Sequence, residues 1–203
     1  MICLEFNLYI QLKFNFIIKK GNNMTKKSIK LNSATIINIR KNLDAEINKS
    51  WRIIRAENVM AKKAIAAGIG SGKDLKALYN EITQLQEKRI KIKAALCYLN
   101  MGLTFNYEEF KKTNNYSIFA AGEAKEAIAQ LKMIPTLDPA TKAKKGLKNI
   151  GKRETFTSAK IASLIKDLQL TANKFDAAME KFNNETLIDL GNLSSEFEHD
   201  VIL

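Results

Sequence analysis

Proline and glycine are scarce in this chain, which has only two prolines and nine glycines among its 203 residues. An all-β fold turns every few residues, and glycine and proline supply most of the turns that such a fold needs. Their scarcity excludes an architecture of many short strands. The hydrophobic share of 46% is ordinary for a globular protein, so the composition predicts an all-α fold.

Cysteine and histidine are also scarce. Cys3 and Cys97 are the only cysteines and belong to no C-x-x-C or Cys/His cluster, which excludes a disulfide framework and a structural zinc site and favours a cytoplasmic setting. His199 is the only histidine; it follows Glu196 at the spacing seen in di-iron bundles, but such a site needs a second Glu-x-x-His pair. A histidine-activated nucleophile would depend on this same residue. We therefore expect no enzymatic activity, no metal site and no cofactor.

Acidic residues are outnumbered, at 21 against 33 lysines and arginines, which gives a net charge of +12 at pH 7. This excess favours an anionic partner such as nucleic acid, an acidic protein or a membrane surface. Residues 140–153 include no acidic residue and are broken by two glycines, so they are predicted to form a solvated, mobile linker whose lysines can neutralise phosphates and release counterions. The candidate nucleic-acid or anion-binding residues are Lys142, Lys144, Lys145, Lys148, Lys152 and Arg153.

An apolar heptad runs without interruption through one predicted helix that ends near residue 100. Such a stripe is a surface that packs against another helix. A preceding helix is predicted over residues 34–67, and the glycine-rich residues 68–72 end it. Two long helices joined by a short loop predict a long antiparallel hairpin similar to a coiled coil. The interface candidates are Leu75, Leu78, Ile82, Leu85, Arg89, Ile92, Leu96 and Leu99.

Arg89 is charged in the middle of this apolar stripe. It would cost stability unless it reached solvent or an acidic partner. A charged residue at such a position can set the register or the oligomeric state of packed helices. Arg89 therefore favours association with another helical chain or with a second copy of this one.

Three more helices are predicted, over residues 107–112, 117–134 and 158–183. The two longer ones are expected to pack on the hairpin and to form a bundle or a self-associating assembly. We predict no membrane span. The last helix carries a stripe of its own, whose interface candidates are Ile161, Ile165, Leu168, Ala172, Phe175, Met179 and Phe182.

The first 23 residues differ from the rest, because apolar and polar residues alternate strictly from Leu4 to Phe16, as in a half-buried strand. One interpretation is a lone exposed strand. The other is a mis-annotated upstream extension, since the codons before Met24 would resemble a ribosome-binding site and indicate a bacterial or bacteriophage gene. The predicted organisation is a leader at 1–23, a helical hairpin with a third helix at 24–134, a basic linker at 135–157, and a helix with an acidic tail at 158–203.

Residues 67–74 combine glycines, a lysine and the start of a helix, as a phosphate-binding loop does. However, Ala67 occupies the position of the first glycine and Asp74 replaces the hydroxyl residue that binds magnesium. We therefore interpret this segment as the turn between two helices and not as a nucleotide site.

Two classes of function fit these features. The first is a nonenzymatic basic binding protein that contacts nucleic acid or an acidic protein through residues 142–153. The second is a structural or adaptor protein that self-associates through its heptad stripes, in which case the lysines only keep the chain soluble. Neutralising Lys142, Lys144, Lys145 and Lys148 together would abolish activity in the first class and leave assembly intact in the second.

Overall fold

The computed structural model describes residues 30–61, 64, 67–137 and 152–187. The chain divides into two units, Met1–Asn32 and Ser33–Leu203, and every element described below belongs to the second unit. The leader at 1–23 lies outside the described residues. The elements in chain order are α2 (Ser33–Glu57), β1 (Val59–Ala61), α4 (Leu75–Asn100), α5 (Tyr107–Phe110), α6 (Asn114–Lys132), β2 (Lys152–Glu154) and α8 (Ser158–Glu185).

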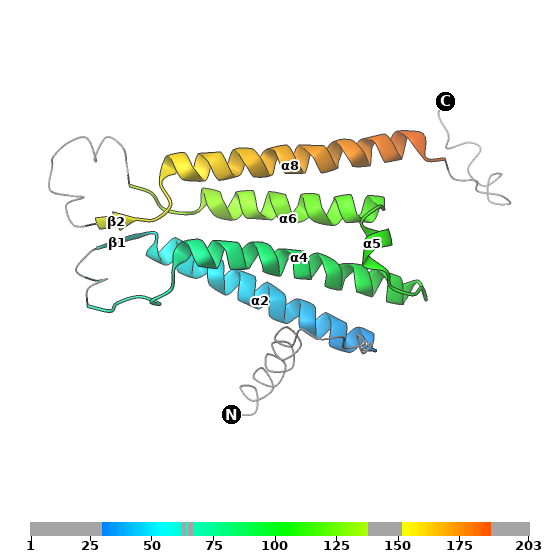
Figure 1. Ribbon diagram of the computed structural model, residues 1–203, viewed down its shortest axis with the longest axis horizontal. Helices are drawn as coiled ribbons and strands as arrows, with labels where there is room; N and C mark the ends of the chain where they lie inside the picture. Colours follow the sequence, from blue (N-terminus) through cyan, green and yellow to red (C-terminus); the bar gives the residue numbers. More distant parts are fainter. Residues whose placement is uncertain (1–29, 62–63, 65–66, 138–151, 188–203) are drawn as a thin grey trace, which may run out of the picture. The chain divides into compact units, whose positions relative to one another are not determined.

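The fold is all-α, with two pairs of long helices. α2 packs along α4 as an antiparallel hairpin, and α6 packs along α8 (Figure 1). The long hairpin and the bundle with two further helices, both predicted from the sequence, are therefore confirmed. Among the described residues, no helix has both the length and the apolar content needed to cross a bilayer.

The main core joins all four long helices. Trp51 of α2 is fully buried, and its ring meets the ring of Tyr79 of α4 edge to face, with centroids 5.9 Å apart. Tyr79 in turn meets Phe156, just before α8, at 5.9 Å. This chain of rings connects the α2–α4 hairpin to the start of α8. The buried members of the core are Leu43, Ile47, Trp51, Ile54, Leu75, Leu78, Ile82, Leu85, Ala127, Leu131, Ile134, Phe156 and Ile161.

A second, smaller core lies at the α5 end of the bundle. Phe110 of α5 is 1% exposed and packs with Ile90, Ala94 and Ala120, which come from α4 and α6. Asn106 begins α5, because its side chain accepts hydrogen bonds from the next backbone amides. This short helix therefore closes the bundle at the point where the chain passes from α4 to α6.

The first helix ends ten residues earlier than the sequence predicts, at Glu57 and not at Ala67. The chain leaves α2 at Asn58 and forms β1, which pairs antiparallel with β2. β2 lies inside the linker predicted at 135–157. The helix propensities of the residues after Glu57 are compatible with a longer α2. We therefore attribute the end of α2 at Glu57 to contacts with residues that are distant in sequence.

Asn58 makes those contacts from a fully buried position. Its Nδ2 donates to the carbonyl oxygens of Pro135, at 2.7 Å, and Phe156, at 2.9 Å. Its Oδ1 accepts from the Phe156 N–H at 2.6 Å. The backbone carbonyl of Asn58 also accepts from the Thr155 N–H at 3.3 Å. One side chain therefore joins the end of α2 to the exit from α6 and to the entry into α8.

Replacing Asn58 with alanine is expected to lower the free energy of unfolding by about 3 kcal/mol, because two carbonyls and one N–H lose their partner in the interior. The measurement is urea unfolding followed by circular dichroism. The matched control is Asn48→Ala on the exposed face of α2, for which we expect a change below about 0.5 kcal/mol. Equal effects of the two changes would contradict the role given to Asn58.

Candidate functional site

The two-stranded sheet brings the ends of two basic runs together. In the antiparallel register, Ala61 pairs with Lys152 and Met60 pairs with Arg153. In the sequence, Lys62 and Lys63 follow Ala61 directly, and the predicted binding lysines precede Lys152. Of those candidates, Lys142, Lys144, Lys145 and Lys148 lie outside the described residues.

More basic side chains surround this sheet end of the bundle, where α2 and α6 end and α4 and α8 begin (Figure 1). Four exposed lysines lie within a few residues of these helix ends, and the part of the chain that the structure describes gives none of them an ion-pair partner. They remain available to an external anion. These lysines are Lys73, Lys76, Lys132 and Lys160.

The carboxylates at the sheet end are occupied by backbone amides. Glu57 accepts from the Ser71 N–H at 2.7 Å and from its hydroxyl at 3.0 Å. Asp74 accepts from the Lys76 N–H at 3.0 Å, and Glu154 accepts from the Leu137 N–H at 2.7 Å. These bonds stabilise turns and helix starts.

Ion pairs between described side chains lie instead in the middle of the bundle and at its α5 end. Lys125 pairs with Asp176 at 2.8 Å, between α6 and α8. The ion pairs between described side chains thus lie in that half, while the four lysines at the sheet end have none. The other pairs outside the Arg89 cluster are Lys91–Glu87, Lys111–Glu108, Lys112–Glu109 and Lys181–Glu185.

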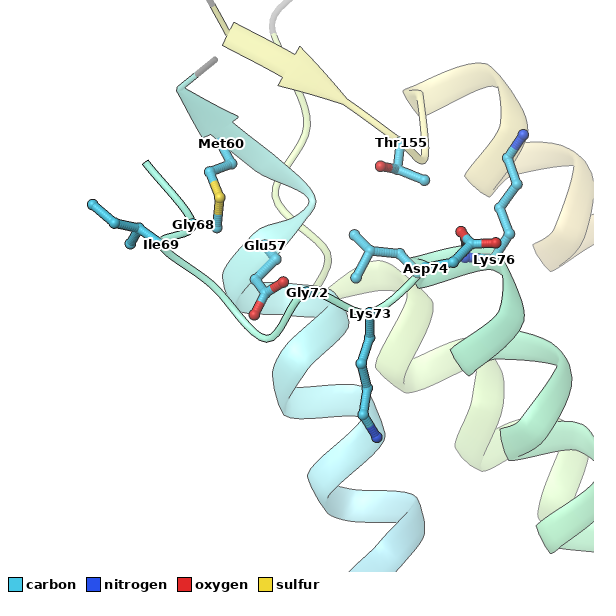
Figure 2. A pocket seen from close by; sticks show the side chains of 10 residues that line it. Glu57, Met60, Gly68, Ile69, Gly72, Lys73, Asp74, Lys76 and Thr155 are labelled. Carbon is cyan, nitrogen blue, oxygen red and sulfur yellow. Dashed lines mark hydrogen bonds between the residues drawn. The ribbon is translucent and has the colours of Figure 1, made fainter. Parts of the chain in front are cut away.

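A pocket of about 600 Å³ opens at the sheet end, between β1, the glycine-rich loop and the start of α4. Figure 2 shows Thr155, Asp74 and Lys76 on one side of it and Met60 and Ile69 on the other. Gly70 has a φ of +123°, and a side chain there would come within 3.2 Å of Met60. The lining of the pocket includes two lysines, Lys73 and Lys76, and two carboxylates, Glu57 and Asp74. The pocket therefore has no excess of positive charge.

Three backbone amides of the glycine-rich loop and of the start of α4 are already hydrogen-bonded. The Ser71 N–H is bonded to Glu57, and the Lys76 N–H is bonded to Asp74. The Lys73 N–H donates to the Ser71 hydroxyl at 3.3 Å. A phosphate-binding loop needs such amides unoccupied, so this geometry supports the interpretation as an inter-helix turn.

The predicted stripe of α4 is buried in its first half only. Leu75, Leu78, Ile82 and Leu85 are buried in the core together with Arg89. Beyond Arg89 the buried positions move to Ile90 and Ala94, and three predicted interface residues are partly or fully exposed. A heptad repeats every 3.5 residues and drifts around a straight helix. The three residues are Ile92, Leu96 and Leu99.

The stripe of α8 is covered less than the sequence suggested. Ile161 and Ala172 are its only buried members among the described residues, because α8 packs mainly against one helix, α6. Phe182 is 46% exposed. The remaining candidates are partly buried: Ile165, Leu168, Phe175 and Met179.

Arg89 finds its acidic partners inside the same chain. Its Nε lies 2.8 Å from Oε1 of Glu123, and its Nη2 also contacts that carboxylate. Asp44 of α2 accepts from Nη1 at 2.9 Å, and Glu126 of α6 accepts from Nη2 at 2.6 Å. Lys93 adds a further contact to Glu123 at 3.0 Å. This charge cluster connects α2, α4 and α6.

The cluster keeps the guanidinium charged. Burial by itself lowers the pKa of Arg89, but the hydrogen bonds that it donates to Glu123 and Asp44 and the negative charges of Glu123 and Glu126 outweigh burial and raise the pKa above its ordinary value. Because Arg89 is satisfied within the chain, its place in the stripe no longer argues for an external helix.

Sequence reasoning missed two members of this arrangement. Two glutamates three residues apart on a helix, such as Glu123 and Glu126, are typical of a solvent-exposed face, yet Glu123 is only 6% exposed. A signal was available, since Glu123 lies among the small apolar residues Ala120, Ala124 and Ala127. Asn58 carried no comparable signal, because its partners are distant in sequence.

Comparisons with family models, curated proteins and solved structures find no match to this chain. Within the described residues, no group of three or more His, Cys, Asp or Glu side chains could hold a metal ion. Glu196 and His199 lie outside those residues.

Replacing Arg89 with methionine is expected to lower the free energy of unfolding by about 3 to 5 kcal/mol, because Glu123 would stay buried with a weaker partner. Adding Glu123→Leu to this variant is expected to restore part of the loss. Chemical denaturation of both variants measures these effects. The control is Lys91→Met in the exposed pair with Glu87, where we expect less than about 1 kcal/mol. A double variant less stable than Arg89→Met alone would contradict the pairing.

Proposed function

We propose that this chain is a nonenzymatic binding protein that contacts the phosphate backbone of nucleic acid through the sheet end of its helical bundle. The antiparallel pairing of β1 with β2 carries the proposal, because it sets Lys152 and Arg153, the last two residues of the basic segment, opposite Ala61 and Met60, and Lys62 and Lys63 follow Ala61 directly in the sequence. The basic segment is therefore anchored at Lys152 and Arg153 to the end of the bundle where the exposed lysines Lys73, Lys76, Lys132 and Lys160 lie.

The distribution of charge supports this proposal. Carboxylates at the sheet end bond to backbone amides, so the exposed lysines there keep their charge available. Several unpaired positive charges at one end raise the local concentration of an anionic partner and speed its association. An acidic protein would be attracted by the same positive charges. The phosphates of nucleic acid are more closely and regularly spaced, however, so more of the lysines can each neutralise one.

The composition of the segment favours the backbone of a duplex over unpaired bases. Proteins that bind single strands stack bases on aromatic side chains. Residues 140–153 contain no aromatic residue, and Phe156, just beyond them, is buried in the core. Binding would therefore be largely independent of base sequence and strongly dependent on salt.

A structural or adaptor role remains the second candidate. Its predicted surface was the pair of heptad stripes, but most of their buried members pack within the chain. This role would therefore need another surface. A cytoplasmic location and a bacterial or bacteriophage origin also stay predictions.

Changing Lys142, Lys144, Lys145 and Lys148 together to alanine is expected to weaken duplex binding and to reduce the slope of log K against log salt by roughly 3 to 4, if each lysine neutralises one phosphate. Fluorescence anisotropy with a labelled duplex over a range of salt concentrations measures both quantities.

The matched control removes four exposed lysines from the middle and the α5 end of the bundle. These are Lys41, Lys88, Lys112 and Lys174. The control has the same net charge as the first variant, so a smaller effect would attribute binding to the segment. Equal loss in both variants, or no binding by the unchanged chain, would refute the proposal.

A further inference from the structure

The loop between α4 and α5 exposes an unusual amount of apolar surface. The apolar loop comprises four large hydrophobic side chains within seven consecutive residues: Leu99, 41% exposed, Met101, 56%, Leu103, 56%, and Phe105, 41%. The other exposed hydrophobics of the described chain, such as Leu170 at 61%, are dispersed over several elements. Single exposed residues need no explanation, but a cluster marks an interaction surface.

The apolar loop is held in one conformation. The Leu103 N–H donates to the Tyr98 carbonyl at 2.9 Å, and the Gly102 N–H donates to the Leu99 carbonyl at 3.1 Å. Gly102 has a φ of +68°, so these bonds form a Schellman end of α4 that favours glycine at this position. The Phe105 ring packs against Tyr98 with centroids 5.6 Å apart. The exposed side chains are therefore presented by a preorganised backbone.

The charges that flank the apolar loop are already paired. Lys111 lies 3.0 Å from Glu108, and Lys112 lies 2.9 Å from Glu109. Lys91 and Lys111 both lie 5.0 Å from the centre of the Tyr107 ring, which follows the loop. Since these pairs leave no excess charge of either sign, a strongly charged partner would gain little here. A partner with the same neutral rim would fit.

Charge elsewhere in the chain opposes a second copy least at this end. Two copies that both carry +12 repel each other through their basic surfaces. α4 has 26 residues and is about 39 Å long, so the apolar loop lies several Debye lengths, of about 8 Å each at physiological salt, from the sheet end. Contact through the loop is the approach that this repulsion opposes least.

We propose that the apolar loop is the centre of a two-fold interface between two copies of this chain. A two-fold interface places the same surface on both sides, so apolar side chains meet apolar side chains and the paired rims meet each other. The two sheet ends then point away from the interface. This proposal does not depend on nucleic-acid binding.

The test is sedimentation velocity of the full chain over a wide range of protein concentrations. We expect a dimer in the unchanged chain, and we expect Leu103→Glu to raise its dissociation constant at least about tenfold, because each interface would bury two carboxylates. The matched control is Leu170→Glu on α8, a similarly exposed leucine with the same change of charge, which should leave the dimer intact. High salt should not weaken the dimer, since an apolar contact is not screened.

Three results would overturn the proposal. A monomer that binds a hydrophobic dye would indicate a different partner, and a monomer that does not would indicate that another part of the same chain covers the loop. A dimer weakened by Leu170→Glu as much as by Leu103→Glu would locate the interface elsewhere. Circular dichroism of both variants establishes that a loss of dimer is not a loss of fold.

Discussion

The buried guanidinium of Arg89 is the constraint on which the packing of α2, α4 and α6 depends. An apolar core can hold this charge only if carboxylates reach it, and here they come from Asp44 on one neighbouring helix and from Glu123 on another. A slip of one helical turn moves a side chain by about 5.4 Å, which would break these bonds. Apolar contacts tolerate such slips better, so the charge cluster selects the register.

Asn58 imposes a similar condition at the opposite end of the bundle. Its amide has both donors and its acceptor satisfied by the backbone of Pro135 and Phe156. Those bonds determine where α2 ends and how the chain turns into α8. Between the Arg89 cluster and Asn58, the helices are joined mainly by apolar side chains. These contacts bury most of the apolar surface, but they specify the relative positions of the helices less strictly than hydrogen bonds and ion pairs do.

Local periodicity explains what could be predicted from the sequence. The stripe from Leu75 to Leu85 identifies the buried face of α4 because helical spacing depends only on near neighbours. Beyond Arg89, α5 and α6 cover a different face and bury Ile90 and Ala94, while the predicted Ile92 is half-buried against the main core. Asn58 was missed because its partners lie 77 and 98 residues away. Strands of three residues are too short to show an alternating pattern.

The distribution of unpaired charge depends on which group each carboxylate binds in the fold. The net charge of the chain does not contain this information. At the sheet end, Glu57 and Asp74 are needed to hold the glycine-rich turn and to cap α4. They therefore do not pair with Lys73 or Lys76, although all four residues line one pocket. At the α5 end, glutamates one turn away on the same helix pair with the lysines. Among the described residues, the lysines that line the pocket are thus unpaired and those that flank α5 are paired, so under the two proposals an anionic partner and a second copy of the chain would bind at different ends.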